Sequence, residues 1–186
     1  MGFKKYVKDY RNEYIIKPDG KPGMVAVYTG KYFRFLASED ELKKARISFA
    51  VLTSLSIVLA AIPLFFKSVG ASSLYVALPH VIAFFPLVHI LLGVGTFWHR
   101  TPPLIREFND KIKTRITVSS VLSMIILGAT AIAEAVNCVM FGFPINDIIY
   151  FLLLAASAAA SGFIFFKRKV LETEECDEDG NPKTQE

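Results

Sequence analysis

The chain of 186 residues is short enough for a single domain and too apolar for an ordinary water-soluble one, because 53% of its residues are hydrophobic and its mean hydropathy is +0.41. Its net charge of +4 and its pI near 9.0 do not indicate nucleic-acid binding, because the basic residues flank apolar segments instead of gathering on one face. Its two cysteines are too few for a disulfide framework or a thiolate metal cluster.

The first 37 residues are predicted to form a cytoplasmic segment of short strands. Residues 14–16, 24–28 and 31–35 are strand-forming runs, and turn-forming residues separate them. We therefore expect a small three-stranded β-meander. Because three short strands are marginally stable alone in water, its aromatic side chains are expected to pack on the membrane surface or on the loop helix. In a second interpretation, this segment is a docking module for a cytoplasmic protein.

Four apolar runs are each long enough to cross a membrane, because about 30 Å of hydrocarbon requires about 20 helical residues. They cover residues 47–66, 69–98, 116–141 and 145–166, and none contains Lys or Arg. Before the first run, Ser38 and Glu41 match a capping box, so a helix over 38–46 is predicted to lead into the first span without a break. The first run begins too late for a cleavable signal peptide, and we expect it to remain in the mature protein. The predicted fold class is an all-α membrane protein, a four-transmembrane-helix bundle with a small cytoplasmic β-meander.

Basic residues fall on one side of the predicted membrane. Of the 21 Lys and Arg residues, 11 lie in residues 1–46, five in 99–115 and four after residue 166, which leaves only Lys67 on the other side. The positive-inside rule then places the N-terminus, the middle loop and the C-terminus in the cytoplasm, and we expect a multi-pass protein of the plasma membrane. The turns at 67–73 and 142–146 are too short to form an extracytoplasmic domain.

The middle loop has apolar residues at helical spacing, whereas the tail is rich in acidic residues. In the loop of residues 99–115, apolar residues recur at helical spacing, which predicts a short amphipathic helix along the inner leaflet. These residues are Leu104, Ile105, Phe108, Ile112 and Ile116. The tail, residues 167–186, carries six acidic residues between Glu172 and Asp179 and is predicted to be disordered and solvated. It serves either as a plain solubilising tail or as an interaction tail.

Ionisable side chains at membrane depth are costly, and they are therefore the first places to look for a functional site. The candidates are His80 and His89 in the second span, and Glu134, Asn137 and Cys138 in the third. At about 100° per residue, the three candidates of the third span lie on one seam with most other polar residues of that helix. This seam is expected to face the bundle interior or a partner subunit. Its other members include Ser119, Ser123 and Thr130.

In the hairpin of the second and third spans, His80 and Glu134 lie at similar depths, so we expect them to pair, with Asn137 as an additional hydrogen-bonding group. His89 follows His80 by nine residues, about half a helical turn in phase, and is expected on the opposite face. One His and one Glu are too few for a closed zinc site, and histidines on a single span do not ligate one haem within a monomer. We therefore expect no cofactor and no metal. In the alternative interpretation these polar groups only hold helices together, and the small residues at 155–162 favour close packing within the bundle or an oligomer.

Two functions remain open from the sequence. The first is a non-catalytic accessory or scaffold subunit of a membrane complex, which fits the one-sided layout. The second is a small oligomeric proton-coupled transporter that uses Glu134, although no inverted repeat is visible. An enzyme is not favoured, because the sequence lacks the His-Glu-x-x-His, Gly-x-Ser-x-Gly and Cys-x-x-Cys motifs. The expected partners are the lipid bilayer and a second copy of the chain or a larger membrane complex.

Overall fold

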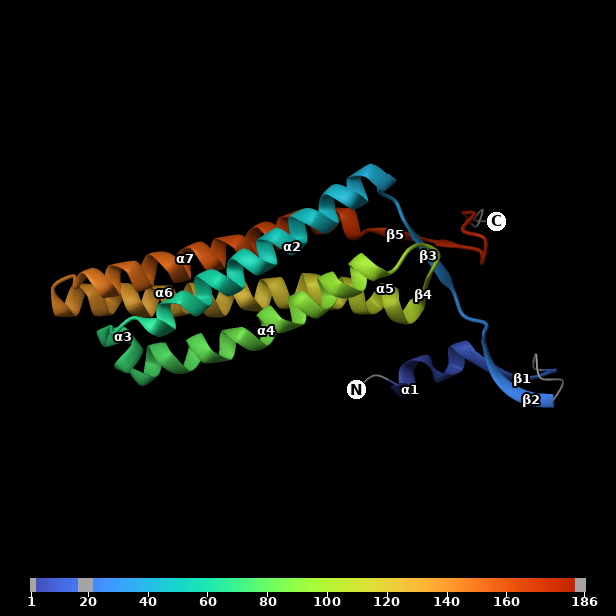
Figure 1. Ribbon diagram of the computed structural model, residues 1–186, viewed down its shortest axis with the longest axis horizontal. Coiled ribbons are helices and arrows are strands. Elements are labelled where there is room, and N and C mark those ends of the chain that lie inside the picture. Colours follow the sequence, from blue (N-terminus) through green and yellow to red (C-terminus); the bar gives the residue numbers. More distant parts are fainter. Residues whose placement is uncertain (1–2, 17–21, 183–186) are drawn as a thin grey trace.

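Four long helices make up most of the molecule (Figure 1). The computed structural model describes residues 3–16 and 22–182 of the chain. The long helices are α2 (Glu39–Ala61), α4 (Leu74–His99), α6 (Ser119–Phe141) and α7 (Ile145–Phe166). All four are long and apolar enough to cross a membrane, so this part of the predicted fold class is confirmed.

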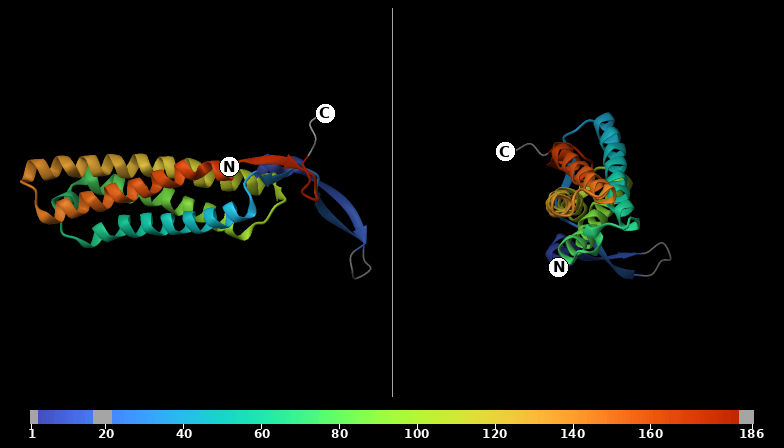
Figure 2. Two further views of the ribbon diagram at one scale, coloured as in Figure 1. Left: turned by 90° about the horizontal axis from the view of Figure 1, so that it is seen from above. Right: turned by 90° about the vertical axis from the view of Figure 1, so that its left-hand side faces the viewer.

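Each long helix has two neighbours in the bundle (Figure 2). Helix α2 packs against α4 and α7, and α6 packs against the same two helices. The connections from α2 to α4 and from α6 to α7 lie at one end of the bundle, which we call the distal end. The short helix α3 (Val69–Ser72) lies there as well. The strands lie toward the opposite end, which we call the terminal end.

Side-chain and backbone signals set the ends of the long helices. The Ser38 hydroxyl accepts from the Glu41 N–H over 3.4 Å and the Glu41 carboxylate accepts from the Ser38 N–H over 2.9 Å, so the predicted capping box is confirmed. Hydrogen bonds from Ser38 hold the pKa of Glu41 below its ordinary value. At the distal end, Gly142 (φ 78°) and Phe143 (φ 58°) adopt left-handed backbone conformations that end α6 and turn the chain into α7.

Three of the long helices are joined at one end to a short 3₁₀-helix or a π-helical turn. Helix α2 passes into the 3₁₀-helix Ile62–Phe65, which contains Pro63, a residue without the N–H that an α-helix needs. Helix α7 passes into the 3₁₀-helix Lys167–Leu171. Helix α5 (Arg106–Lys113) runs through the π-helical turn Thr114–Val118 into α6.

Small polar residues hold the centre of the bundle together. The Ser56 hydroxyl of α2 lies 2.9 Å from the Ser157 hydroxyl and 3.0 Å from the Ser161 hydroxyl of α7. Ser123 of α6 also bonds to Ser161 over 3.0 Å, so three helices share one buried serine cluster. The small-residue run of the fourth span therefore packs inside this bundle, as hydroxyl and glycine-sized side chains allow close helix approach.

The predicted β-meander is wrong in its third strand. Strands β1 (Tyr10–Ile16) and β2 (Pro22–Tyr28) form an antiparallel hairpin, preceded by α1 (Phe3–Tyr6) and the 3₁₀-helix Val7–Asp9. Strand β3 (Tyr32–Phe35) instead lies between β4 (Leu104–Ile105) and β5 (Thr173–Cys176) in a separate sheet. Partners from the middle loop and the tail thus take the place beside β3 that was predicted for β2. The turn-forming residues 18–21, between the first two predicted strands, lie outside the described residues.

The prediction of a disordered tail is wrong for residues 173–176, which form β5. Arg34 on β3 pairs with Glu174 over 2.5 Å, and Lys31, just before β3, pairs with Glu175 over 2.6 Å. Leu171 and Cys176 on either side of these acids are buried. Acidic residues that indicated solvation in the sequence are thus partly neutralised by basic residues of the N-terminal segment.

The predicted helix of the middle loop is present as α5, but its apolar face turns into the protein. Leu104 and Ile105, which were predicted within this helix, form β4 instead. Ile112 and Ile116 are fully buried, and α5 extends α6 instead of forming a separate helix. An apolar face that packs on the bundle is not available to a lipid surface. The expectation of a separate helix along the inner leaflet is corrected accordingly.

Candidate functional site

The polar seam of α6 faces the inside of the bundle. All six of its predicted members, Ser119, Ser123, Thr130, Glu134, Asn137 and Cys138, are buried. The predicted orientation of the third span is therefore confirmed. Glu134 lies seven residues before the end of α6 at Phe141, about 10 Å from the distal end of that helix.

Glu134 is held by groups from three helices. The Asn137 Nδ2 donates to Glu134 Oε2 over 3.2 Å, and the Tyr75 hydroxyl of α4 donates to Asn137 Oδ1. Gly70 of α3 lies against the same carboxyl group, because a Cβ atom at this position would stand 1.6 Å from Glu134 Oε2. The missing side chain at Gly70 thus makes room for the Glu134 carboxyl group.

A second buried carboxyl group, that of Asp147 in the first turn of α7, meets the first. The Asp147 Oδ1 accepts from the Val69 N–H over 2.9 Å, so it lies beside the residue that precedes Gly70. Because Gly70 lies against the Glu134 carboxyl group, the two buried carboxyl groups lie near each other. Ionised carboxylates only accept hydrogen bonds, so the two groups could bond to each other only with a proton on one of them.

One shared proton would satisfy the carboxyl pair formed by Glu134 and Asp147. Within the described part of the chain, Glu134 Oε1 and Asp147 Oδ2 are buried and have no conventional donor. Leaving a buried polar oxygen without a partner is costly, and two adjacent buried charges of one sign are more costly still. In chemical terms, the arrangement can hold one proton and release it when the carboxyl pair gains another donor.

His80 does not pair with Glu134, contrary to the prediction. Its Nε2 lies 2.8 Å from the Ala60 carbonyl oxygen, which only accepts, so Nε2 carries the proton. Its Nδ1, 2.6 Å from the Tyr150 hydroxyl, then accepts from that group in the neutral ring. Both ring nitrogens of this fully buried histidine are satisfied by α2 and α7, and this favours a structural role.

The other two candidates are placed differently again. His89 is exposed on the far side of α4 from His80, as its half-turn offset predicted, and its Nδ1 lies 3.1 Å from the Phe85 carbonyl oxygen. Cys138 is buried in the seam, and its carbonyl accepts from the Phe143 N–H over 2.8 Å at the end of α6. Neither residue contributes a side-chain hydrogen bond to the carboxyl pair.

Sequence reasoning missed Asp147, Tyr75, Tyr150 and Gly70. Asp147 stands at the start of a span, where an acidic residue normally faces solvent and interacts with the helix dipole. The signal that could have identified it is its surroundings, since Ile145, Ile148 and Ile149 make its immediate sequence mostly apolar. The short loop after α6 then brings it back beside Glu134.

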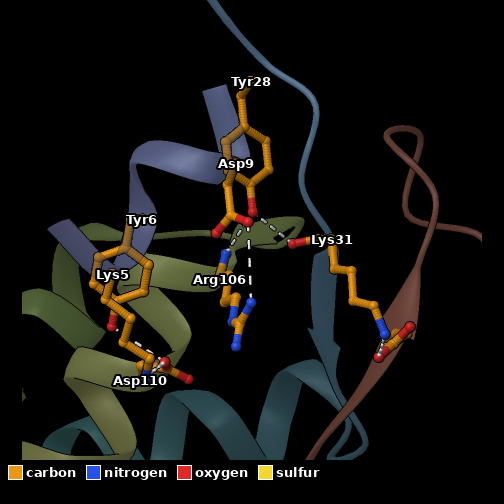
Figure 3. A network of polar contacts seen from close by, with 8 residues as sticks. Lys5, Tyr6, Asp9, Tyr28, Lys31, Arg106 and Asp110 are labelled. Carbon is orange, nitrogen blue, oxygen red and sulfur yellow. Dashed lines mark hydrogen bonds and ion pairs between the residues drawn. The ribbon is translucent and has the colours of Figure 1, made fainter. Parts of the chain in front are cut away.

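A second polar arrangement ties the N-terminal segment to the terminal end of the bundle (Figure 3). Asp110 of α5 accepts from Lys5 over 2.7 Å and from the Tyr6 hydroxyl over 3.1 Å. The backbone N–H of Arg106 donates to the Tyr28 hydroxyl over 3.0 Å, and that hydroxyl donates to the Lys31 carbonyl over 2.8 Å. The base of the hairpin is therefore fixed, and the pKa of Tyr28 is raised by burial.

Beyond this base, the hairpin of β1 and β2 projects away from the bundle (Figures 1 and 2). Tyr14 and Met24 are directly opposite each other and are 76% and 59% exposed. Closer to the base, the same face of the hairpin borders a groove of about 430 Å³. Its lining residues are Tyr6, Val7, Tyr10, Asn12, Ala26 and Glu107.

The arrangement of acidic residues, histidines and cysteines offers little for a metal. Among residues 3–16 and 22–182, no three or more of these side chains come together in a way that could hold an ion. The carboxyl pair and the projecting hairpin are therefore the two features from which a function can be argued. Comparison of the chain with family models, with curated proteins and with solved structures gave no match.

Proposed function

We propose that the chain is a non-catalytic subunit of the plasma membrane that presents its β1–β2 hairpin to a cytoplasmic protein partner, as an accessory or scaffold protein. The projecting hairpin is the observation on which this proposal depends. An isolated two-stranded hairpin is marginally stable in water, and this one is fixed at its base by polar contacts while Tyr14 and Met24 stay exposed. Exposed aromatic and methionine side chains are typical of protein-binding surfaces.

The exposed surface of the helices supports the membrane part of the proposal. In each long helix, less than half of the apolar stretch is buried inside the protein. Water-soluble monomers rarely expose so much continuous apolar surface, whereas lipid would cover it. Among the residues that the structure describes, Lys67 is the only basic residue at the distal end, which favours a cytoplasmic location for the terminal end.

Co-purification in mild detergent tests the recruiting role. We expect the full chain to bring down a protein partner at a fixed stoichiometry, and we expect the double variant Tyr14→Asp, Met24→Asp to reduce its recovery at least about tenfold. The matched control is Glu13→Ala, which changes the adjacent residue on the opposite face of β1. Equal recovery with the double variant and the control would contradict the proposal.

The carboxyl pair supports a second candidate, a proton-coupled transporter that works as an oligomer. In this function the pair of Glu134 and Asp147 takes up and releases a proton as substrate crosses the membrane. The variant Glu134→Gln retains the size of the side chain and cannot release a proton. If this variant folds normally but abolishes proton-linked uptake in vesicles, the transporter is favoured, and if uptake is absent in the wild type too, this candidate is rejected.

A further inference from the structure

An apolar groove with two lysines at one end lies between α2 and α7 on the outside of the bundle. The groove has a volume of about 620 Å³. Ile47, Val51 and Leu52 of α2 and Phe163 of α7 form its apolar walls. Lys44, Ser48 and Lys167 line it as well and lie at its terminal end, where the two long helices leave their apolar stretches.

The apolar walls of the groove face outward. Ile47, Val51 and Phe163 are 57%, 58% and 60% exposed. Three large apolar side chains are exposed together beside a helix interface that the serine cluster already packs. Shielding them from water would require a separate apolar partner. An acyl chain running along the helices matches the shape and the chemistry of these walls.

The two lysines are positioned to bind one anionic group. Lys167 extends from α7 to donate to the Ser48 hydroxyl of α2 over 2.6 Å, which holds its ammonium group across the head of the groove. Lys44 contributes a second ammonium group from α2. Glu41, one turn before Lys44, accepts hydrogen bonds from Ser38 and also interacts electrostatically with Lys44, so it offsets part of the Lys44 charge. Among the described residues that line the groove itself there is no acidic side chain, so its charge stays positive.

We propose that this groove binds one anionic phospholipid of the leaflet at the terminal end. Its phosphate lies between the ammonium groups of Lys44 and Lys167, and one of its acyl chains covers Ile47, Val51 and Phe163. Basic pockets between membrane helices on the cytoplasmic side bind anionic headgroups by the same combination of charge and apolar contact. The inference rests on the membrane insertion proposed above and is independent of the protein partner.

Lipid retention by the purified full chain tests the site. The chain is reconstituted in vesicles of phosphatidylglycerol and phosphatidylcholine, extracted in mild detergent, and its bound lipid is measured by native mass spectrometry. We expect phosphatidylglycerol to be retained preferentially by the wild type, and we expect the double variant K44Q/K167Q to lose this preference at least fivefold. The matched control K43Q/K169Q removes the same charge from two neighbouring lysines outside the groove and is expected to retain it.

A variant that leaves the charge unchanged tests the apolar half of the site. Val51→Trp fills the groove, and we expect it to reduce lipid retention while both lysines remain. Equal loss with K43Q/K169Q and K44Q/K167Q would overturn the proposal, since it would show general surface attraction. Equal retention of both lipids, or dimers that form in place of bound lipid, would overturn it too. Flotation of each variant with vesicles checks membrane insertion separately, so that failure of insertion and failure of the lipid site give different results.

Discussion

Gly70 shows how the absence of one side chain determines the position of another. The Glu134 carboxyl group lies in the space that a side chain at residue 70 would occupy, and Asp147 reaches the same place through the N–H of Val69. The two acidic residues are 13 positions apart in the sequence and come from different helices. Their contact therefore depends on the backbone of α3 as much as on their own helices.

Gly70→Ala is predicted to destabilise the protein by about 1–3 kcal/mol, because the new methyl group displaces the Glu134 carboxyl group from its hydrogen bonds. Thermal unfolding in detergent measures the effect. The control is Gly95→Ala in α4, where an added Cβ atom would meet nothing within 4 Å and where alanine is the better helix former.

The loss of stability caused by Gly70→Ala should also depend on Glu134. In a Glu134→Ala background, the Gly70→Ala substitution is expected to cost less than it does in the wild type, because the carboxyl group it displaces is gone. Equal costs in the two backgrounds would argue against the close approach described above.

The helices could be predicted from the sequence to a much greater extent than the strands. A membrane-length apolar run between charged segments is a local signal, and the Ser38 capping box is confined to four residues. Strand pairing has no such local signal, since β3 pairs with β5 about 140 residues later in the chain. The same reason explains the site: the α6 seam follows from helical spacing, whereas the contact with Asp147 requires the arrangement of α3, α6 and α7.

The ion pair between Arg34 of β3 and Glu174 of β5 can be tested by reversing the charges of its two residues. Glu174→Lys places a second cation beside Arg34, and we expect it to weaken the pairing by up to about 1 kcal/mol, since both side chains are partly exposed. Hydrogen exchange of the β3 amides should therefore become faster. The double variant Arg34→Glu, Glu174→Lys restores opposite charges and should slow exchange again, whereas continued fast exchange would show that the ion pair does not hold the strands together.

The start of α2 is predicted to loosen in acid. Because Ser38 lowers the pKa of Glu41 below its ordinary value of 4.5, the folded state favours the ionised form. The stabilisation is therefore present above the ordinary pKa and is lost as the pH falls through the lowered pKa. Amide exchange at residues 39–42, corrected for the intrinsic effect of pH, should show this loss. Ser38→Ala should remove most of the dependence on pH, and an unchanged dependence would exclude the capping box as its cause.

At the scale of the whole molecule, the proposed orientation predicts which surfaces are accessible from each side of the membrane. In a variant without native cysteines, Lys67→Cys at the distal end should react with an impermeant thiol reagent added to intact cells. Thr101→Cys at the terminal end should react only after the cells are opened. Reaction of both positions in intact cells, or of Thr101→Cys alone, would contradict the orientation.

The three-stranded sheet also has a consequence for the order of events during synthesis. Strand β3 precedes all four long helices, whereas β5 follows the last of them, so the sheet cannot close until the ribosome has made all four helices. A nascent chain that stalls before residue 173 would expose β3 with an unpaired edge, and unpaired edges of this kind invite association with other chains. Closure of this sheet would therefore distinguish a chain that already contains all four long helices from one that does not.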